Sequence, residues 1–196
     1  MSSLGWAAAA VVLGLAVLAL GLEAAGFDAG PALGALWLGA FGSWDAFTST
    51  TLVRAVPLTI IGLGIAIAFR GGALNIGAEG QFYAGAIAAT WVGLHIGEQP
   101  AAVAIVALLL ASAAAGLIWV VVPVWLKVRF GVIEVISTLL LNFVAVSLVS
   151  LMVQGPLQEQ GRIYPQSDAI SEAARLPLLS GSRLHAGFAI ALAGGL

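Results

Sequence analysis

The sequence has no cysteine, and only 8% of its 196 residues are charged. Without cysteine the chain forms neither a disulfide framework nor a thiolate metal site. Its net charge of −2 excludes a nucleic-acid binder that depends on an excess of basic residues. A soluble domain carries about a quarter charged residues, whereas 61% of this chain is apolar. The composition therefore predicts a protein embedded in membrane lipid.

Motifs for catalysis and for nucleotide binding are also missing. The sequence contains no G-x-x-x-x-G-K-[ST] loop to cradle ATP phosphates and no H-E-x-x-H zinc motif. Its two histidines, His95 and His185, fall in or beside predicted external loops, where a solvated side chain is the expected state. We therefore expect a protein that is not an enzyme and that binds no cofactor and no metal of its own.

Long uncharged runs locate the membrane spans. A helix that crosses the hydrocarbon needs about 20 apolar residues. The runs predict an all-α, polytopic transmembrane helix bundle with five complete spans and the start of a sixth, at about residues 6–25, 52–69, 79–97, 100–126, 133–155 and 184–196. Residues 156–183 are expected to form an external loop. Since 13 residues are too few for the last span, residues 1–196 are expected to be a single transmembrane domain in a fragment of a longer chain.

The first apolar segment has a second interpretation, as a secretory signal peptide. It has no Lys or Arg before its apolar run, and that run is longer than a usual signal core. A retained first span is the favoured interpretation.

Basic residues in short loops predict the orientation. Lys127 and Arg129 form the densest basic turn, which places that turn in the cytoplasm. Counting back along the spans puts the N-terminus in the cytoplasm and the loop with Glu98 outside. Arg54 is then on the outer side, against the rule. The location expected from the family resemblance described below is the bacterial cytoplasmic (inner) membrane.

The most polar stretch between two apolar runs is residues 69–81, FRGGALNIGAEGQ. Its glycines, and the mere 15 uncharged residues of the run before it, predict an interrupted or re-entrant segment around residues 70–81. Irregular backbone at membrane depth is tolerated only beside protein or a watery cavity. Asn75, Glu79 and Gln81 are therefore candidates for the wall of a solute pathway, and their amides suit a neutral solute. For Glu79 the alternative is a simple favourable position at a helix N-terminus.

A second polar group lies in residues 131–143, GVIEVISTLLLNF. Glu134, Thr138 and Asn142 are spaced i, i+4, i+8 and so share one helix face. Thr138 and Asn142 are predicted either to line the pathway or to hold helices together by hydrogen bonds. Glu134 lies so close to the basic turn that we expect it, with Lys127 and Arg129, to contact a cytoplasmic partner or to cap the interface.

Small residues predict close packing of the span at residues 79–97. They recur every four residues on two faces of that helix, and Ser112 and Gly116 repeat the spacing in the next span. Small residues let membrane helices approach closely, so this span is expected to lie inside the bundle.

Two blocks of the sequence resemble a known family. FRGGALNIGAEGQFYAGA and GVIEVISTLLLNF are similar to segments of the inner-membrane permease subunits of ABC importers for nucleosides and simple sugars, relatives of the branched-chain amino acid and ribose permeases. The resemblance covers about residues 52–155.

The resemblance implies a set of partners. These are a second permease subunit, two cytoplasmic ATPase subunits that bind ATP and magnesium, and an external substrate-binding protein, with lipid around the spans and no nucleic acid. The main ATPase-docking loop of the family is expected beyond Leu196. Two alternatives stay open: a secondary transporter driven by an ion gradient, and a membrane assembly protein without transport.

Overall fold

The computed structural model describes residues 3–179 and 181–195. They form helices α1 (Ser3–Ala24), α2 (Ala29–Phe41), η1 (a π-helix, Ala46–Leu52), α3 (Val53–Arg70), α4 (Ala78–His95), α5 (Ala101–Phe130), α6 (Glu134–Val153), η2 (a single 3₁₀ turn, Glu172–Ala174) and α7 (Gly187–Gly195). The only strand-like pairing in these residues is one isolated bridge, Leu178 to His185. The predicted all-α class is confirmed.

Within residues 3–179 and 181–195, four helical stretches are long and apolar enough to cross a membrane: Gly5–Ala24, Ala46–Arg70, Ala101–Phe130 and Glu134–Val153. The predicted count of five complete spans is not reached by this criterion. Helix α4 has 18 residues but carries polar side chains in its first turns, including Glu79 and Gln81, and α7 has nine residues. By length and composition, several of these helices are therefore suited to span a membrane.

The second span is longer than predicted. It was expected at about residues 52–69, with only 15 uncharged residues in a row, but helical backbone runs without a break from Ala46 to Arg70, which is 25 residues. A single arginine near a helix end does not stop a helix, because its long side chain reaches toward water. The helix before Arg70 is therefore long enough to cross the membrane, and its shortness does not explain the non-helical segment that follows.

Contacts divide the described chain into two units. One comprises the chain up to Val56 with Leu178–Phe188, and the other comprises Pro57–Pro177 with the residues from Ala189 on. Within the first unit, the Glu23 carboxylate accepts the N–H of Ala29 at 3.0 Å and joins the turn between α1 and α2. The Ser49 hydroxyl oxygen accepts the N–H of Arg183 at 3.1 Å, which fixes the returning chain to η1.

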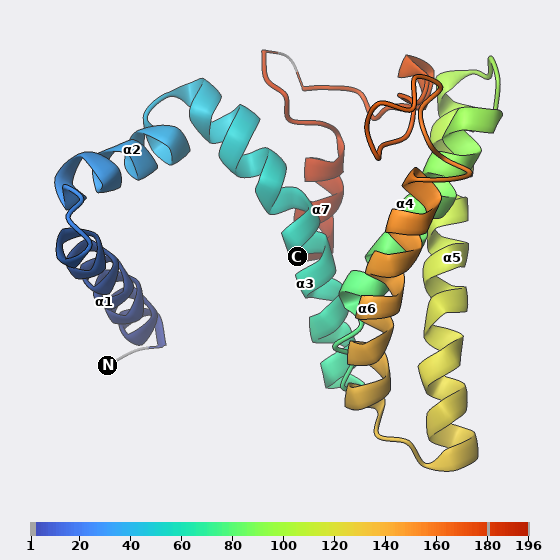
Figure 1. The fold of residues 1–196 in the computed structure, drawn as a ribbon, viewed down its shortest axis with the longest axis horizontal. Coiled ribbons are helices and arrows are strands. Elements are labelled where there is room, and N and C mark those ends of the chain that lie inside the picture. The colour runs from blue at the N-terminus through green and yellow to red at the C-terminus, as the bar shows by residue number, and fades with distance from the viewer. Residues whose placement is uncertain (1–2, 180, 196) are drawn as a thin grey trace. The chain divides into compact units, whose positions relative to one another are not determined.

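The second unit is built around α4, which packs against both α5 and α6 (Figure 1). Buried small residues of α4, among them Gly80, Ala84 and Gly85, make this contact. A Cβ at Gly85 would lie 3.2 Å from the carbonyl oxygen of Ser112, and the Ser112 hydroxyl donates to the carbonyl of Gly85 at 3.0 Å. The predicted close packing of this helix on two neighbours is confirmed.

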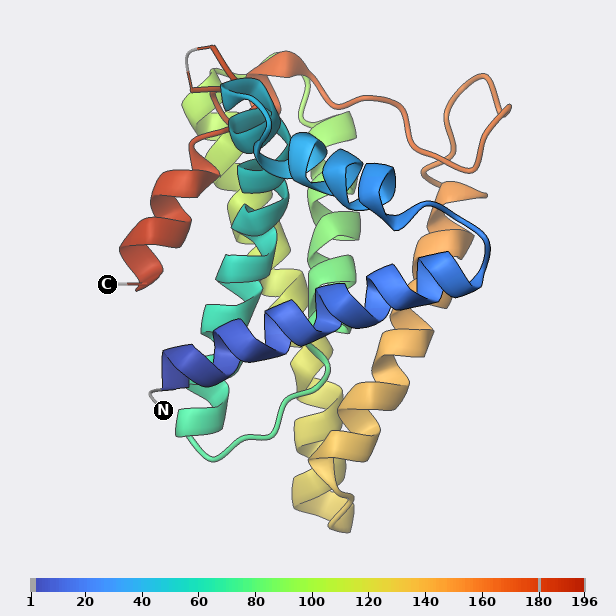
Figure 2. The same ribbon diagram turned by 90° about the vertical axis from the view of Figure 1, so that its left-hand side faces the viewer.

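After α6 the chain is mostly irregular and returns to the far end of α4 and α5, as Figure 2 shows. Ile170 packs against Gly93, where a Cβ would lie 2.7 Å from the Ile170 Cγ2. Buried Ala104, Leu108 and Ala174 complete a small apolar cluster at this end. The contacts hold the long segment against the helix pair, while its placement outside the membrane stays a prediction.

Candidate functional site: a broken helix held by a polar row

Residues 71–77, here called the connector, join α3 to α4 without helical backbone (Figure 2). Helix α3 ends because Gly72 has a φ of +81°, a left-handed conformation that only glycine adopts without strain. The N–H of Ala73 donates to the carbonyl of Ala68 at 2.9 Å and closes the helix end. The break predicted around residues 70–81 is present, and it is confined to these seven residues.

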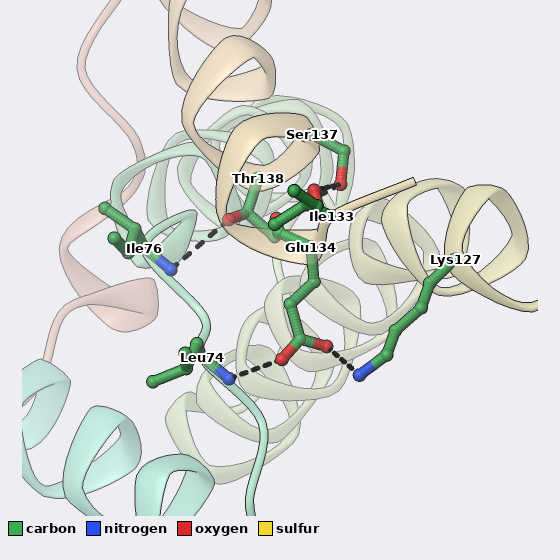
Figure 3. Close-up of polar contacts among 7 residues, drawn as sticks. All are labelled: Leu74, Ile76, Lys127, Ile133, Glu134, Ser137 and Thr138. Atoms are coloured by element: carbon green, nitrogen blue, oxygen red, sulfur yellow. Dashed lines mark hydrogen bonds and ion pairs between the residues drawn. The ribbon is translucent and has the colours of Figure 1, made fainter. Parts of the chain in front are cut away.

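Glu134, Thr138 and Asn142, here called the polar row, bind the connector and the start of α4 along one face of α6. The Glu134 Oε1 accepts the N–H of Leu74 at 2.8 Å, and the Thr138 Oγ1 accepts that of Ile76 at 3.3 Å (Figure 3). Asn142 makes two bonds: its Oδ1 accepts the Gly80 N–H at 2.9 Å and its Nδ2 donates to the Ile76 carbonyl at 3.0 Å. Backbone groups that lost helical partners at the break are satisfied in this way.

The polar row meets the connector in the order of the sequence. Glu134 binds Leu74 and Thr138 binds Ile76. Asn142 binds Ile76 as well and reaches Gly80 in the first turn of α4. One face of α6, with polar residues spaced by four, therefore supplies partners for backbone groups on both sides of the break.

Two glycines let the connector approach α6 this closely. A Cβ at Gly77 would lie 2.9 Å from the Thr138 Cβ, and one at Gly80 would lie 2.8 Å from the Trp119 Nε1 and 3.0 Å from the Asn142 Oδ1. Contacts below 3.0 Å force a displacement, so both positions require glycine. The buried Nε1 of Trp119 has no hydrogen-bond partner within the described part of the chain.

The basic turn reaches the same site. Helix α5 ends at Gly131, which has a φ of +68° and turns the chain back toward α6. This turn sets Lys127 opposite Glu134, and the two form an ion pair (Figure 3). Glu134 thus binds Lys127 and the Leu74 N–H together, while the Arg129 guanidinium lies 5.6 Å from the centre of the Phe130 ring. Contact of these three charged residues with a partner subunit stays a prediction.

Asn75 and Gln81 meet across the start of α4. The Asn75 Nδ2 donates to the Gln81 Oε1 at 3.0 Å, and the Asn75 Oδ1 accepts the N–H of Gly77 at 2.8 Å. Both side chains are half-buried, and both line a cavity of about 650 Å³ between α3, α4 and α5. Ligand pockets commonly have volumes of about 300–1,000 Å³.

The five predicted pathway residues therefore separate into three groups. Asn75 and Gln81 line the cavity. Thr138 and Asn142 are buried and face the backbone of the connector and of α4, which is the helix-holding alternative considered for them. Glu79 is exposed and is not part of the lining of this cavity.

Sequence reasoning missed the α3 and α5 sides of the cavity. Ile61 and Ile65 contribute from α3, and Leu109 and Ser112 from α5. Of these, only Ser112 had been singled out from the sequence, because it belongs to the series of small residues that predicts close helix packing. Aliphatic side chains in apolar helices look the same whether they face lipid, protein or a cavity.

Comparison with known proteins decides the family. Residues 47–194 match the profile of the family described as the permease component of the branched-chain amino acid transport system. The chain belongs to this family. The match covers both blocks that carried the resemblance, and it makes the chain a permease component and a multi-pass membrane protein. No solved structure gives a significant match.

Curated relatives of this permease component are named as ABC transporter permeases. The chain is 38% identical over 194 residues to the glucose ABC transporter permease protein TsgB13 of Haloferax volcanii, covering 93% of this chain and 50% of that protein. It is 36% identical over 191 residues to the guanosine ABC transporter permease protein NupP of Bacillus subtilis, covering 93% of this chain and 53% of that protein. The chain spans about half the length of these relatives.

Proposed function

We propose that this chain forms part of the membrane pathway of an ATP-driven importer for nucleosides or related sugars. The family match and the printed names of the relatives support an ABC permease. The observation that supports a solute pathway is the cavity of about 650 Å³, which is lined in part by the connector and the start of α4. Broken helices recur at the solute sites of transporters, where they expose backbone and amide groups to the solute.

In this proposal the polar row keeps the connector in place while the cavity admits the solute. Asn75 and Gln81 present amide groups, which hydrogen-bond neutral solutes without attracting ions strongly. The cavity is otherwise largely apolar, so it lowers the barrier for an uncharged solute and lets it leave again. ATP and magnesium bind to two cytoplasmic ATPase subunits. A second permease subunit and an external substrate-binding protein complete the assembly in the inner membrane.

The basic turn is the proposed cytoplasmic contact. Lys127 and Arg129 are exposed there, and Lys127 is paired with Glu134, which binds the connector. A movement of this turn by an ATPase subunit would therefore reach the connector through the side chains of Lys127 and Glu134.

The test is uptake by vesicles that contain the full-length protein with its partner subunits. Labelled guanosine and labelled D-glucose are supplied in parallel, with ATP inside the vesicles or with an imposed proton gradient alone. The proposal predicts that uptake of at least one solute requires ATP and co-purification of the ATPase subunits. Uptake that persists on the proton gradient without ATP would contradict it and would favour a secondary transporter.

A further inference from the structure

One backbone N–H fixes the orientation of two side-chain amides in the cavity. The N–H of Gly77 is only a donor, so the Asn75 atom that meets it at 2.8 Å is the oxygen Oδ1. The Asn75 Nδ2 then faces Gln81, and the Gln81 atom that meets it at 3.0 Å is Oε1. The remaining Gln81 nitrogen, Nε2, has two N–H groups and no partner within the described residues.

The free hydrogen-bonding capacity of the pair is therefore rich in donors. Both amide oxygens already accept a hydrogen bond, whereas the Gln81 Nε2 and one N–H of Asn75 remain unused. The Ser112 hydroxyl donates its one hydrogen bond to the carbonyl of Gly85, so its oxygen can only accept a further hydrogen bond. Polar groups of the lining are few, and they belong to the connector, α4 and α5.

The rest of the lining is mostly apolar. Ile61 and Ile65 of α3, Phe82 of α4 and Leu109 of α5 surround the same space. A hexose has hydroxyl groups all around its ring, and most of these would lose their hydrogen bonds to water here without finding a new partner, which is unfavourable. A heteroaromatic base has two apolar faces and a polar edge, which matches an apolar space with a polar side.

We infer that Gln81 determines specificity by donating, through Nε2, to a ring-nitrogen acceptor on the edge of a purine base, while the apolar side chains cover the faces of that base. This inference rests on the proposed transport function and selects nucleosides over simple sugars. Asn75 is a positioning residue in this arrangement, because it turns the Gln81 amide so that its nitrogen is free.

The experiment measures ATP-dependent uptake by the full-length protein with its partner subunits in vesicles. The solutes are guanosine, 3-deazaguanosine, 7-deazaguanosine and D-glucose, and each deaza analogue lacks one ring-nitrogen acceptor. Wild type is compared with Gln81→Glu, which keeps an oxygen for the Asn75 Nδ2 but replaces the free donor by an acceptor. Gln81→Met, which removes both polar atoms, is a second variant. Gln99→Glu, in the exposed turn before α5, is the matched control, and size-exclusion chromatography checks assembly.

We expect guanosine uptake by wild type and by Gln99→Glu, with kcat/KM about tenfold or more lower in Gln81→Glu, the usual size of one lost hydrogen bond. A deaza analogue that wild type carries about tenfold less well than guanosine should lose that disadvantage in both Gln81 variants. Equal uptake of all three nucleosides by wild type, or an analogue disadvantage that survives in both variants, would overturn the inference.

The glucose arm separates the inference from the proposed function. ATP-dependent uptake of D-glucose without uptake of any nucleoside would overturn the choice of a nucleobase and leave the importer function intact. Absence of ATP-dependent uptake of every solute would overturn the proposed function and the inference together.

Discussion

Asn142 holds both sides of the break in the helix: its Oδ1 accepts the N–H of Gly80 at 2.9 Å and its Nδ2 donates to the carbonyl of Ile76 at 3.0 Å. In a continuous helix the Gly80 N–H would donate directly to the Ile76 carbonyl, four residues earlier. The Asn142 amide bridges the two partners of that one missing backbone hydrogen bond. Because the bond to Gly80 is buried and the bond to Ile76 is partly buried, water is a poor substitute. The geometry of the connector depends on this residue.

Replacement of Asn142 by Leu should therefore destabilise the protein. The change keeps the size of the side chain but leaves the buried Gly80 N–H without a partner, which costs about 1–3 kcal/mol. Thermal unfolding of the full-length protein in detergent should shift downward, and uptake should fall. Ser147→Ala is the control, since Ser147 is exposed on the same helix and its hydroxyl bonds to the carbonyl of Phe143. Equal unfolding temperatures for the two variants would contradict this role.

Gly80 is a second sensitive position, for steric reasons. In Gly80→Ala the new Cβ would lie 2.8 Å from the Trp119 Nε1, so the connector end of α4 must move away from α5. Overpacking of this kind costs about 1–3 kcal/mol. The matched control is Gly62→Ala, because nothing lies within 4 Å of a Cβ there and alanine favours helix over glycine. Gly80→Ala should lower the melting temperature and Gly62→Ala should not; the reverse order would be inconsistent with the packing described.

Glu134 has two bonds whose effects are separable by substitution. Glu134→Gln keeps an oxygen for the Leu74 N–H but loses the charge that pairs with Lys127, whereas Glu134→Leu loses both. Lys127→Met removes only the ion pair. We expect uptake to fall slightly in Glu134→Gln and Lys127→Met, because exposed ion pairs contribute little, and to fall further in Glu134→Leu. Equal uptake by Glu134→Gln and Glu134→Leu would show that the bond to Leu74 is not needed.

The hydrogen bonds of Glu159 should make the segment after α6 less stable at low pH. Hydrogen bonds from the Gln166 side chain and from the Tyr164 N–H lower the pKa of Glu159 below its usual 4.5. A lowered pKa in the folded state stabilises the fold above the ordinary pKa, and this contribution is lost as the pH falls through the lowered value. A spin label at Ile163→Cys should therefore gain mobility below pH 4.5. In a Glu159→Gln background the label should show no such transition, and an unchanged transition there would rule out Glu159 as its source.

The sequence predicted the helical class, the break after Arg70 and the close packing of α4, because composition, glycine clusters and small-residue spacing each have a direct structural cause. It also predicted that Glu134, Thr138 and Asn142 share a face. Which groups they meet was not predictable, since a polar row at helical spacing serves a pore and a neighbouring backbone equally well. The α3 side of the cavity was missed because Ile61 and Ile65 resemble any lipid-facing residues.

The measurement that tests the central claim most directly is the water accessibility of the cavity. Because the described chain has no cysteine of its own, Ala86→Cys on the cavity wall is compared with Ala114→Cys, an exposed position on α5 outside this lining. Both variants of the assembled transporter are treated with a charged, water-soluble thiol reagent, with and without the transported solute. A solute pathway predicts fast modification of Ala86→Cys that the solute slows, and slow modification of Ala114→Cys that the solute does not affect. Modification of Ala86→Cys no faster than that of Ala114→Cys, with or without solute, would contradict the account.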